Sequence, residues 1–298
     1  NGFHPLCYGK RVDGSYVIAS ESCALDVVGA EFIREIRPGE ILVFGKEGIR
    51  SITDHCDKAP ERFCVFEYIY FARPDSVIDG CSVHLARQRA GSFLALEHPV
   101  QADVVIGVPD SGLDAAIGFS RQSGIPYGIG FIKNKYIGRT FISAGQKSRE
   151  NKVKIKLNPI AETIKGKRVV LIDDSIVRGT QLRETTEYLF ASGAKEVHIR
   201  PACPPLVYGC KYLNFSRSTS EMELITRRVI KKLEGCEPTE EILHEYTDPD
   251  SEKYQNMVDE ICKELHFTSL RYHRLDDMID SVGIDPDKLC TYCWNGKE

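Results

Sequence analysis

Residues 168–181 read Arg168-Val-Val-Leu-Ile-Asp-Asp-Ser-Ile-Val-Arg-Gly-Thr-Gln181. Val169 to Ile172 form an unbroken apolar run rich in β-branched residues, which is typical of a strand buried on both faces of a parallel sheet. Apolar residues then recur at helical spacing from Gln181 to Ser192, and another strand begins at Glu196. These residues therefore predict a βαβ unit within an α/β fold.

The loop of this unit carries candidate chemistry. Asp173 and Asp174 follow the strand, at the edge where open α/β sheets bind ligands. Gly179 can adopt a positive φ, and we expect Thr180 to cap the next helix. Backbone N–H groups between Ser175 and Thr180 predict a phosphate site, while the two carboxylates suit hydroxyl groups or a hydrated Mg²⁺. A sugar phosphate suits both parts of this loop, with its phosphate on the N–H groups and its hydroxyls on the carboxylates. The alternative is an ordinary βαβ turn, because such turns can also carry two acids and a glycine.

A second βα turn has a similar composition. Residues 102–111 predict a buried strand that ends in a small polar loop, and an Ala/Ile-rich helix follows to Ser123. The loop Pro109-Asp110-Ser111-Gly112 offers N–H groups and a hydroxyl to another phosphate group. Two such loops on neighbouring parallel strands suit a diphosphorylated sugar.

Between these two strands lies a basic, glycine-containing segment, Lys133-Asn-Lys-Tyr-Ile-Gly-Arg-Thr-Phe141. It is either a solvated surface loop or a loop that folds over an anionic substrate and excludes water. Its position between two predicted phosphate loops favours the second interpretation.

The composition bounds the class of protein. The chain has 298 residues, 42% of them hydrophobic, which allows one large domain or two with a substantial core. A formal net charge of −4 gives no global basic field, so we expect no nucleic-acid partner. We recognise no apolar segment long enough for a membrane and no signal peptide. We therefore expect a globular, cytoplasmic protein without a membrane partner.

The rest of the chain divides by composition. We predict a β-rich segment over residues 1–45, with strands at 16–20 and 41–44, and a polar linker over 46–62. The aromatic run 63–71 favours a strand, and the pattern of residues 83–97 favours a helix. Residues 221–234 and 250–265 predict solvated helices that show no chemistry.

Eleven cysteines at irregular spacing fit a secreted disulfide framework poorly and metal or cluster ligation better. Cys290-Thr-Tyr-Cys293 is a C-x-x-C motif, which can be redox-active, zinc-binding or incidental. Cys64 and Cys210 are candidates for two further thiolate ligands because each lies beside a predicted strand end.

The pattern of residues 169–180 resembles the phosphoribosyl-diphosphate (PRPP) signature of type I phosphoribosyltransferases. Together with segments 66–76, 107–111, 133–141 and the C-x-x-C tail, it resembles glutamine PRPP amidotransferase (amidophosphoribosyltransferase) of the iron–sulfur class. The resemblance covers nearly the whole chain and is weakest between residues 219 and 288. It implies a type I phosphoribosyltransferase domain over 63–298, with a helical cover and a cluster-binding tail. It also implies a linker over 46–62 and, over 1–45, the β-rich end of a glutaminase domain of the N-terminal-nucleophile hydrolase type.

The resemblance also implies residue roles. Asp173 and Asp174 would hold the ribose hydroxyls and, with Ser111, a Mg²⁺ ion. The 5-phosphate would lie on Ser175, Arg178, Gly179 and Thr180. Further contacts with PRPP would come from Pro109, Asp110 and Ser111. The closing loop would contribute Lys133, Tyr136 and Arg139. A 4Fe–4S cluster would be held by Cys64, Cys210, Cys290 and Cys293. The implied reaction is displacement of pyrophosphate from PRPP by ammonia, which gives phosphoribosylamine in the first committed step of purine (IMP) biosynthesis.

The chain departs from this family at its first residue. The family's glutaminase uses an N-terminal cysteine whose own α-amine serves as base, and residue 1 here is Asn. We therefore expect no catalytic nucleophile and no glutaminase activity in this chain. Expected partners are PRPP, ammonia derived from glutamine in the intact enzyme, purine nucleotides as feedback inhibitors, and further copies in a dimer or tetramer.

Two other functions compete with this interpretation. A base-salvage phosphoribosyltransferase would share the PRPP signature, but the tail thiolates and residues 66–76 argue against it. A PRPP-binding regulator without enzymatic activity should carry a basic DNA-binding segment, and neither the net charge nor the sequence supports one.

Overall fold

A computed structural model describes residues 1–134, 157–213 and 221–297. The chain forms two compact units. The first comprises residues 1–87, 279–291 and Lys297, and the second comprises 88–278 and 292–296. Within the described ranges, no helix is long and apolar enough to cross a membrane.

A parallel sheet forms the centre of the second unit. Its strands are β9 (Val104–Gly107), β12 (Arg168–Asp173), β13 (Glu196–Pro201) and β14 (Ser269–Leu270), in the order β14-β13-β12-β9. All three pairings are parallel, with Leu171 opposite Ile106 on one side and Ile199 on the other. Val169 to Ile172 are fully buried, which confirms the predicted strand buried on both faces.

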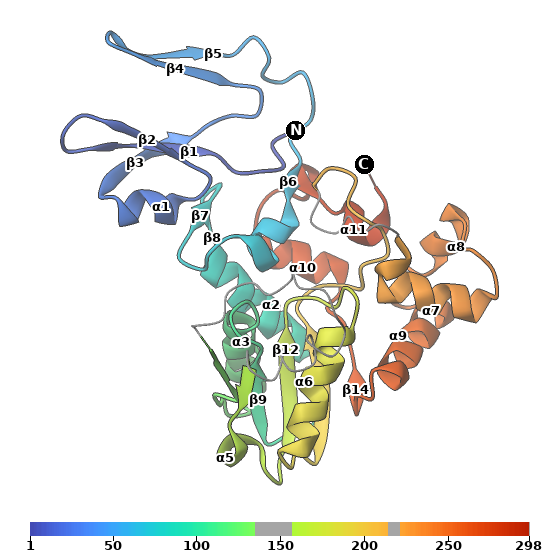
Figure 1. Ribbon diagram of the computed structural model, residues 1–298. Helices are drawn as coiled ribbons and strands as arrows, with labels where there is room; N and C mark the ends of the chain where they lie inside the picture. The colour runs from blue at the N-terminus through green and yellow to red at the C-terminus, as the bar shows by residue number, and fades with distance from the viewer. Residues whose placement is uncertain (135–156, 214–220, 298) are drawn as a thin grey trace, which may run out of the picture. The chain divides into compact units, whose positions relative to one another are not determined.

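Helices cover both faces of this sheet, as Figure 1 shows. On one face, α3 (Leu113–Ser123) and the end of α2 (Val83–Glu97) pack Phe119 and Leu94 against Val170 and Ile172. On the other face lies α6 (Thr180–Ala191), whose Leu189 is fully buried. The predicted helices over 83–97 and up to Ser123 are confirmed, as is the βαβ unit around residues 168–181.

Beside β9 lies a small two-stranded element. It consists of β10 (Phe131–Lys133) and β11 (Leu157–Pro159), which pair antiparallel, followed by the short helix α5 (Ala161–Ile164).

The segment after β13 is largely helical. It contains η2 (Glu221–Glu223), α7 (Ile225–Glu234), α8 (Glu240–Glu245), α9 (Glu252–Glu264), α10 (Leu275–Val282), η3 (Pro286–Lys288) and α11 (Tyr292–Asn295). The helices α7 and α9 pack together, and each has fully buried apolar residues, Ile225 and Ile230 in α7 and Met257 and Ile261 in α9. The helices predicted over 221–234 and 250–265 are thus confirmed, and each buries an apolar side.

The first unit begins with an antiparallel sheet of β1 (Cys7–Arg11), β2 (Tyr16–Ala19) and β3 (Ala30–Glu35), in the order β2-β1-β3. The helix α1 (Ser22–Val27) places Leu25 in a small core with Cys7 and Ala30. A hairpin follows, made of β4 (Ile41–Gly45) and β5 (Gly48–Ile52). The predicted β-rich segment is confirmed, but part of the segment expected as a linker is strand, because the turn at 45–48 lets the chain pair with β4.

The prediction of one strand over residues 63–71 is wrong. Only β6 (Phe63–Cys64) is extended, and η1 (Glu67–Phe71) is a π-helical turn in which the N–H of Ala72 donates to the carbonyl of Glu67 at 3.0 Å. Residues 64–69 are all buried, which is compatible with a buried strand as well as with a helical turn, so the burial pattern does not separate the two. The buried Arg87 stabilises the turn, since its guanidinium donates to the carbonyls of Tyr68 and Ala72 at 2.7 and 2.8 Å. Two further short strands, β7 (Val77–Ile78) and β8 (Cys81–Ser82), form a hairpin.

Candidate functional site

Two loops meet at the carboxyl ends of β9 and β12. The first, residues 109–112, leads into α3, and the second, residues 175–179, leads into α6; we call the second the phosphate loop. The N–H of Val108 donates to the carbonyl of Ile172 at 2.9 Å. A Cβ atom on Gly112 would lie 2.5 Å from the same carbonyl oxygen, so only glycine allows the first loop to approach β12 this closely.

The two predicted acids lie where β12 ends. Asp174 is buried, and its carboxylate accepts the hydroxyl of Ser175 at 2.5 Å and also the hydroxyl of Ser111 from the neighbouring loop. Asp173 accepts the N–H of Asp174 at 2.9 Å and forms no ion pair with the described residues. The structure thus brings Asp173, Asp174 and Ser111 together, as the sequence predicted.

The electrostatics of the acid pair favour a cation or hydroxyl ligand. Burial, together with the charge of Asp174, raises the pKa of Asp173 well above its ordinary value. A metal ion or a row of hydroxyl donors would offset this repulsion.

The phosphate loop presents open backbone donors. In the described part of the chain, the N–H groups of residues 175–179 donate to no acceptor. The N-terminus of α6 has no side-chain cap and no acidic residue in its first turn. Such a row of free N–H groups at the positive end of a helix suits a phosphate.

The helix begins one residue earlier than predicted. Its capping position is Gly179, with φ +78°, and Thr180 is the first helical residue. The predicted positive φ of Gly179 is confirmed, and the predicted capping role of Thr180 is wrong. Glycine takes the capping position because the chain turns there through a left-handed conformation.

The loop over 109–112 offers a smaller set of donors. The N–H groups of Asp110 and Ser111 have no acceptor among the described residues, and Pro109 has no N–H to offer. Asp110 forms an ion pair with Lys133 of β10. Of the predicted closing loop, Lys133 therefore lies beside the site, whereas Tyr136 and Arg139 lie outside the described residues.

Sequence reasoning missed the contribution of η2, α7 and α9. Arg178, whose side chain is largely exposed, forms an ion pair with Glu223. The carbonyls of Val177 and Arg178 accept from Ile225 and Arg228. No local pattern in residues 221–265 indicates these contacts, because an amphipathic helix has the same sequence whichever loop it contacts.

The four cysteines predicted to bind a cluster are buried or half-buried. Cys64 in β6 lies directly opposite Cys290 in β15 (Leu289–Cys290), a parallel pairing that puts both side chains on one face. The carbonyl of Cys293 accepts the N–H groups of Val207 and Tyr208 at 3.1 and 3.0 Å, just before Cys210. Within the described ranges, however, no group of three or more His, Cys, Asp or Glu side chains is placed to hold a metal ion.

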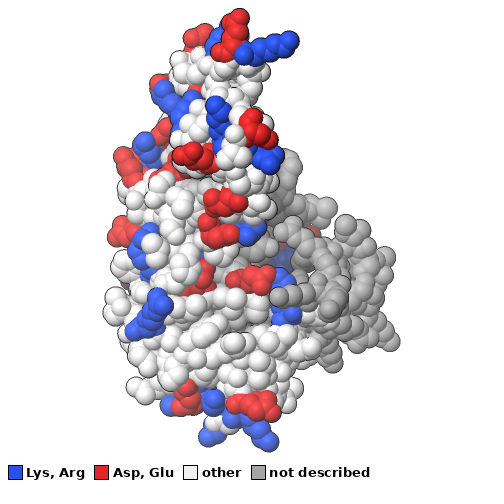
Figure 2. Space-filling model, turned by 90° about the vertical axis from the view of Figure 1, so that its left-hand side faces the viewer, with Lys and Arg blue, Asp and Glu red and all other residues white. Residues whose placement is uncertain are grey.

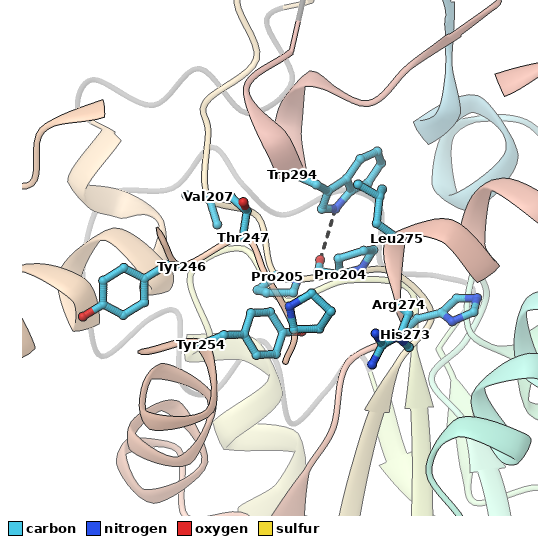
Figure 3. A pocket seen from close by; sticks show the side chains of 11 residues that line it. Pro204, Pro205, Val207, Tyr246, Thr247, Tyr254, His273, Arg274, Leu275 and Trp294 are labelled. Atoms are coloured by element: carbon cyan, nitrogen blue, oxygen red, sulfur yellow. Dashed lines mark hydrogen bonds between the residues drawn. The ribbon is translucent and has the colours of Figure 1, made fainter. Parts of the chain in front are cut away.

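The pocket drawn in Figure 3 lies elsewhere, between residues 204–207 and the segment 246–275. Its wall includes Trp294, whose indole N–H donates to the carbonyl of Pro204 at 3.1 Å. Its cavity volume of about 20 Å³ has room for about one water molecule, which is far less than a sugar phosphate needs.

The face of the molecule drawn in Figure 2 carries no broad basic patch among the described residues, because its Lys and Arg side chains are interspersed with Asp and Glu. On this face, an anion would have to be recognised by local groups rather than by a long-range positive field.

The parallel sheet and the two loops define a type I phosphoribosyltransferase fold, and residues 84–203 match the family model "Phosphoribosyl transferase domain". The amidophosphoribosyltransferase of Archaeoglobus fulgidus is 50% identical over 221 residues, which cover 74% of this chain and 48% of that protein. The amidophosphoribosyltransferase of Mycobacterium tuberculosis is 42% identical over 297 residues, 99% of this chain and 51% of that protein. The chain belongs to the amidophosphoribosyltransferase family, a pentosyltransferase family, and it spans about half the length of these relatives.

Two solved structures are similar to this chain in both sequence and fold. Glutamine PRPP amidotransferase from B. subtilis, complexed with ADP and GMP, is 41% identical and matches with a TM-score of 0.81. The match covers 100% of this chain and 59% of that one. A structure described as the allosteric regulatory enzyme of purine biosynthesis matches with the same TM-score at 40% identity.

Proposed function

We propose that this chain carries the PRPP site of an amidophosphoribosyltransferase, which forms phosphoribosylamine and pyrophosphate from PRPP and ammonia in purine biosynthesis. The observation that carries the proposal is the row of open N–H groups at residues 175–179 beside the carboxylates of Asp173 and Asp174. This arrangement matches one sugar phosphate, with the 5-phosphate on the amides and the vicinal hydroxyls on the acids.

The residues then have distinct roles. Ser175, Arg178, Gly179 and Thr180 hold the 5-phosphate, while Pro109, Asp110 and Ser111 meet the diphosphate. Ammonia attacks C1 as the bond to pyrophosphate breaks, and the new amine loses a proton to water. The sugar acquires oxocarbenium character, which the carboxylate of Asp173 or Asp174 stabilises by charge. Lys133, Tyr136 and Arg139 belong to the segment that closes over the substrate and excludes water.

Mg²⁺ fits the acid pair. Asp173, Asp174 and the hydroxyl of Ser111 are oxygen donors of the kind Mg²⁺ prefers, and Asp173 has no competing cation among the described residues. When bound, Mg²⁺ would neutralise part of the diphosphate charge and assist its departure.

We also propose that Cys64, Cys210, Cys290 and Cys293 bind a 4Fe–4S cluster. The direct opposition of Cys64 and Cys290, and the hydrogen bonds that join residues 207–208 to Cys293, support two thiolate pairs. No step of the reaction requires the cluster.

The remaining assignments follow the family. Residues 1–45 would be the end of a glutaminase domain, 46–62 a linker, and 63–298 the transferase domain with its helical cover. Large apolar side chains are exposed on the strands of the first unit, among them Ile18, Phe32 and Ile41, which suits a β-sheet that packs against another surface. With this assignment we also propose that purine nucleotides inhibit the protein, that it forms a homo-oligomer and that it is located in the cytoplasm.

Pyrophosphate release tests the function. We expect the chain, supplied with Mg²⁺ and PRPP, to release pyrophosphate slowly with ammonium at alkaline pH, where free NH₃ is appreciable. Glutamine should not replace ammonium, because none of the residues assigned to the PRPP site is a cysteine that could release ammonia from it. Turnover with glutamine would show that a cysteine outside this site is the nucleophile, and absence of both PRPP binding and turnover would contradict the assignment.

A further inference from the structure

The carbonyl groups of the phosphate loop are held by α7. The N–H of Ile225 donates to the carbonyl of Val177 at 2.9 Å, and Nη2 of Arg228 donates to the carbonyl of Arg178 at 3.2 Å. In a planar trans peptide the C=O and N–H bonds point in opposite directions. These two bonds therefore turn the N–H groups of Arg178 and Gly179 away from α7 and leave them open.

Arg228 is itself fixed on both sides of its guanidinium. Nη1 donates to the carbonyl of Glu223 at 3.4 Å, and Nη2 lies 3.6 Å from Oε1 of Glu264 at the end of α9. The side chain thus joins α7, α9 and the phosphate loop. A charged donor on the Arg178 carbonyl also polarises that peptide, which strengthens the next N–H as a donor.

The packing around this contact leaves the loop little freedom. A Cβ atom on Gly179 would lie 2.8 Å from Cδ1 of Ile225 and 2.9 Å from Cδ1 of Leu265. Both of these side chains are buried. The loop is therefore pressed against α7 and α9, and Arg228 supplies a polar contact at the rim of this apolar one.

We propose that Arg228 is a positioning residue for the phosphate loop. It orients the peptide that joins Arg178 to Gly179, so that the amides of the loop converge on a phosphate monoester, and it does so without contacting the substrate. This inference rests on the proposed function of the loop. Part of the specificity for the 5-phosphate then comes from α7, a helix whose sequence contains no recognised functional motif.

The test compares two ends of the same substrate. Ribose 5-phosphate offers only the group that the phosphate loop should bind, whereas Mg-pyrophosphate offers only the group expected at residues 109–111. We expect Arg228→Met to weaken ribose 5-phosphate and Mg-PRPP about tenfold in calorimetric titration, since one charged hydrogen bond is lost. Binding of Mg-pyrophosphate should stay within about twofold.

Lys232→Met is the matched control. Lys232 lies one turn further along α7 and pairs with Glu260 of α9, so its loss also removes an ion pair between these helices but no contact with the loop. We expect it to leave all three ligands within about twofold. Equal weakening of ribose 5-phosphate and pyrophosphate by Arg228→Met, or the same losses in Lys232→Met, would overturn the proposal.

Arg228→Lys gives a second measurement, which also serves if Arg228→Met does not fold. The shorter ammonium keeps the charge beside Glu264 but falls short of the Arg178 carbonyl, so we expect about threefold weaker ribose 5-phosphate binding. Unchanged binding in this variant would contradict the role of Arg228. If the unaltered chain binds no Mg-PRPP, the proposed function fails instead.

Discussion

Gly179 shows how strongly one residue is constrained at this site. Its φ of +78° is a conformation that L side chains rarely adopt, and a Cβ atom would force the side-chain ends of Ile225 and Leu265 to shift. Gly124, at the end of α3, has a similar φ of +75° but nothing within 4 Å of its Cβ position. A side chain at Gly124 would therefore meet backbone strain alone, whereas a side chain at Gly179 would meet backbone strain and steric crowding.

We predict that Gly124→Ala destabilises the chain by about 1 kcal/mol through strain alone. Gly179→Ala should cost about 2–4 kcal/mol, because overpacking against two buried side chains is added. Urea unfolding of the two variants beside the parent measures both costs. Equal destabilisation would mean that the contacts of Gly179 with Ile225 and Leu265 are loose.

At the scale of elements, the turn between β7 and β8 lies against the end of β3. The N–H of Asp79 in this turn donates to Oε1 of Glu35 at 2.5 Å. Burial, reinforced by the hydrogen bond and charge of Glu35, raises the pKa of Asp79 to about 8. Asp79 is therefore protonated in the folded chain at neutral pH, whereas in the unfolded chain it ionises near pH 4.

The sign of the pH effect follows from this difference. Between pH 4 and pH 8 the folded state binds more protons at Asp79 than the unfolded state, so stability falls as the pH rises. We predict that Asp79→Asn, which stays neutral, loses about 2 kcal/mol less stability than the parent chain between pH 5 and pH 8. Urea midpoints at the two pH values are the measurement. Parallel losses in both chains would show that Asp79 is ionised in the folded state.

Some elements could be predicted from sequence and others could not. The run Val169–Ile172 predicts β12 because a strand buried on both faces needs continuous apolar residues, and the acids and Gly179 after it define the site locally. The aromatic residues 67–71 favour a strand by propensity, yet the contacts of Arg87 stabilise a π-helical turn. The contact of Arg228 with the phosphate loop is not local, since 50 residues separate them, and a helix sequence does not specify which loop it touches.

At the scale of the whole molecule, the cluster prediction depends on cysteines from distant parts of the chain. Anaerobically purified protein should be brown and contain about four irons per chain. Replacing Cys64, Cys210, Cys290 or Cys293 by Ser should remove most of the iron, because each thiolate holds one corner of the cluster. Cys236→Ser is the control, since this exposed cysteine is outside the predicted set. Stoichiometric zinc without iron would instead indicate a structural zinc site.

In the whole site, as we propose it, two loops on neighbouring strands bind one PRPP molecule. Asp173 has no ion pair among the described residues, while the carboxylate of Asp110 is 70% exposed and already paired with Lys133. The two acids should therefore differ in their importance for the ligand.

Calorimetric titration with Mg-PRPP measures this difference. We expect the parent chain to bind Mg-PRPP and Asp173→Asn to weaken this binding by about 2 kcal/mol, roughly thirtyfold. Asp110→Asn should have a much smaller effect, because an exposed, paired carboxylate contributes little. Equal weakening by the two substitutions, or no binding by the parent chain, would show that the two loops do not bind PRPP in the proposed way.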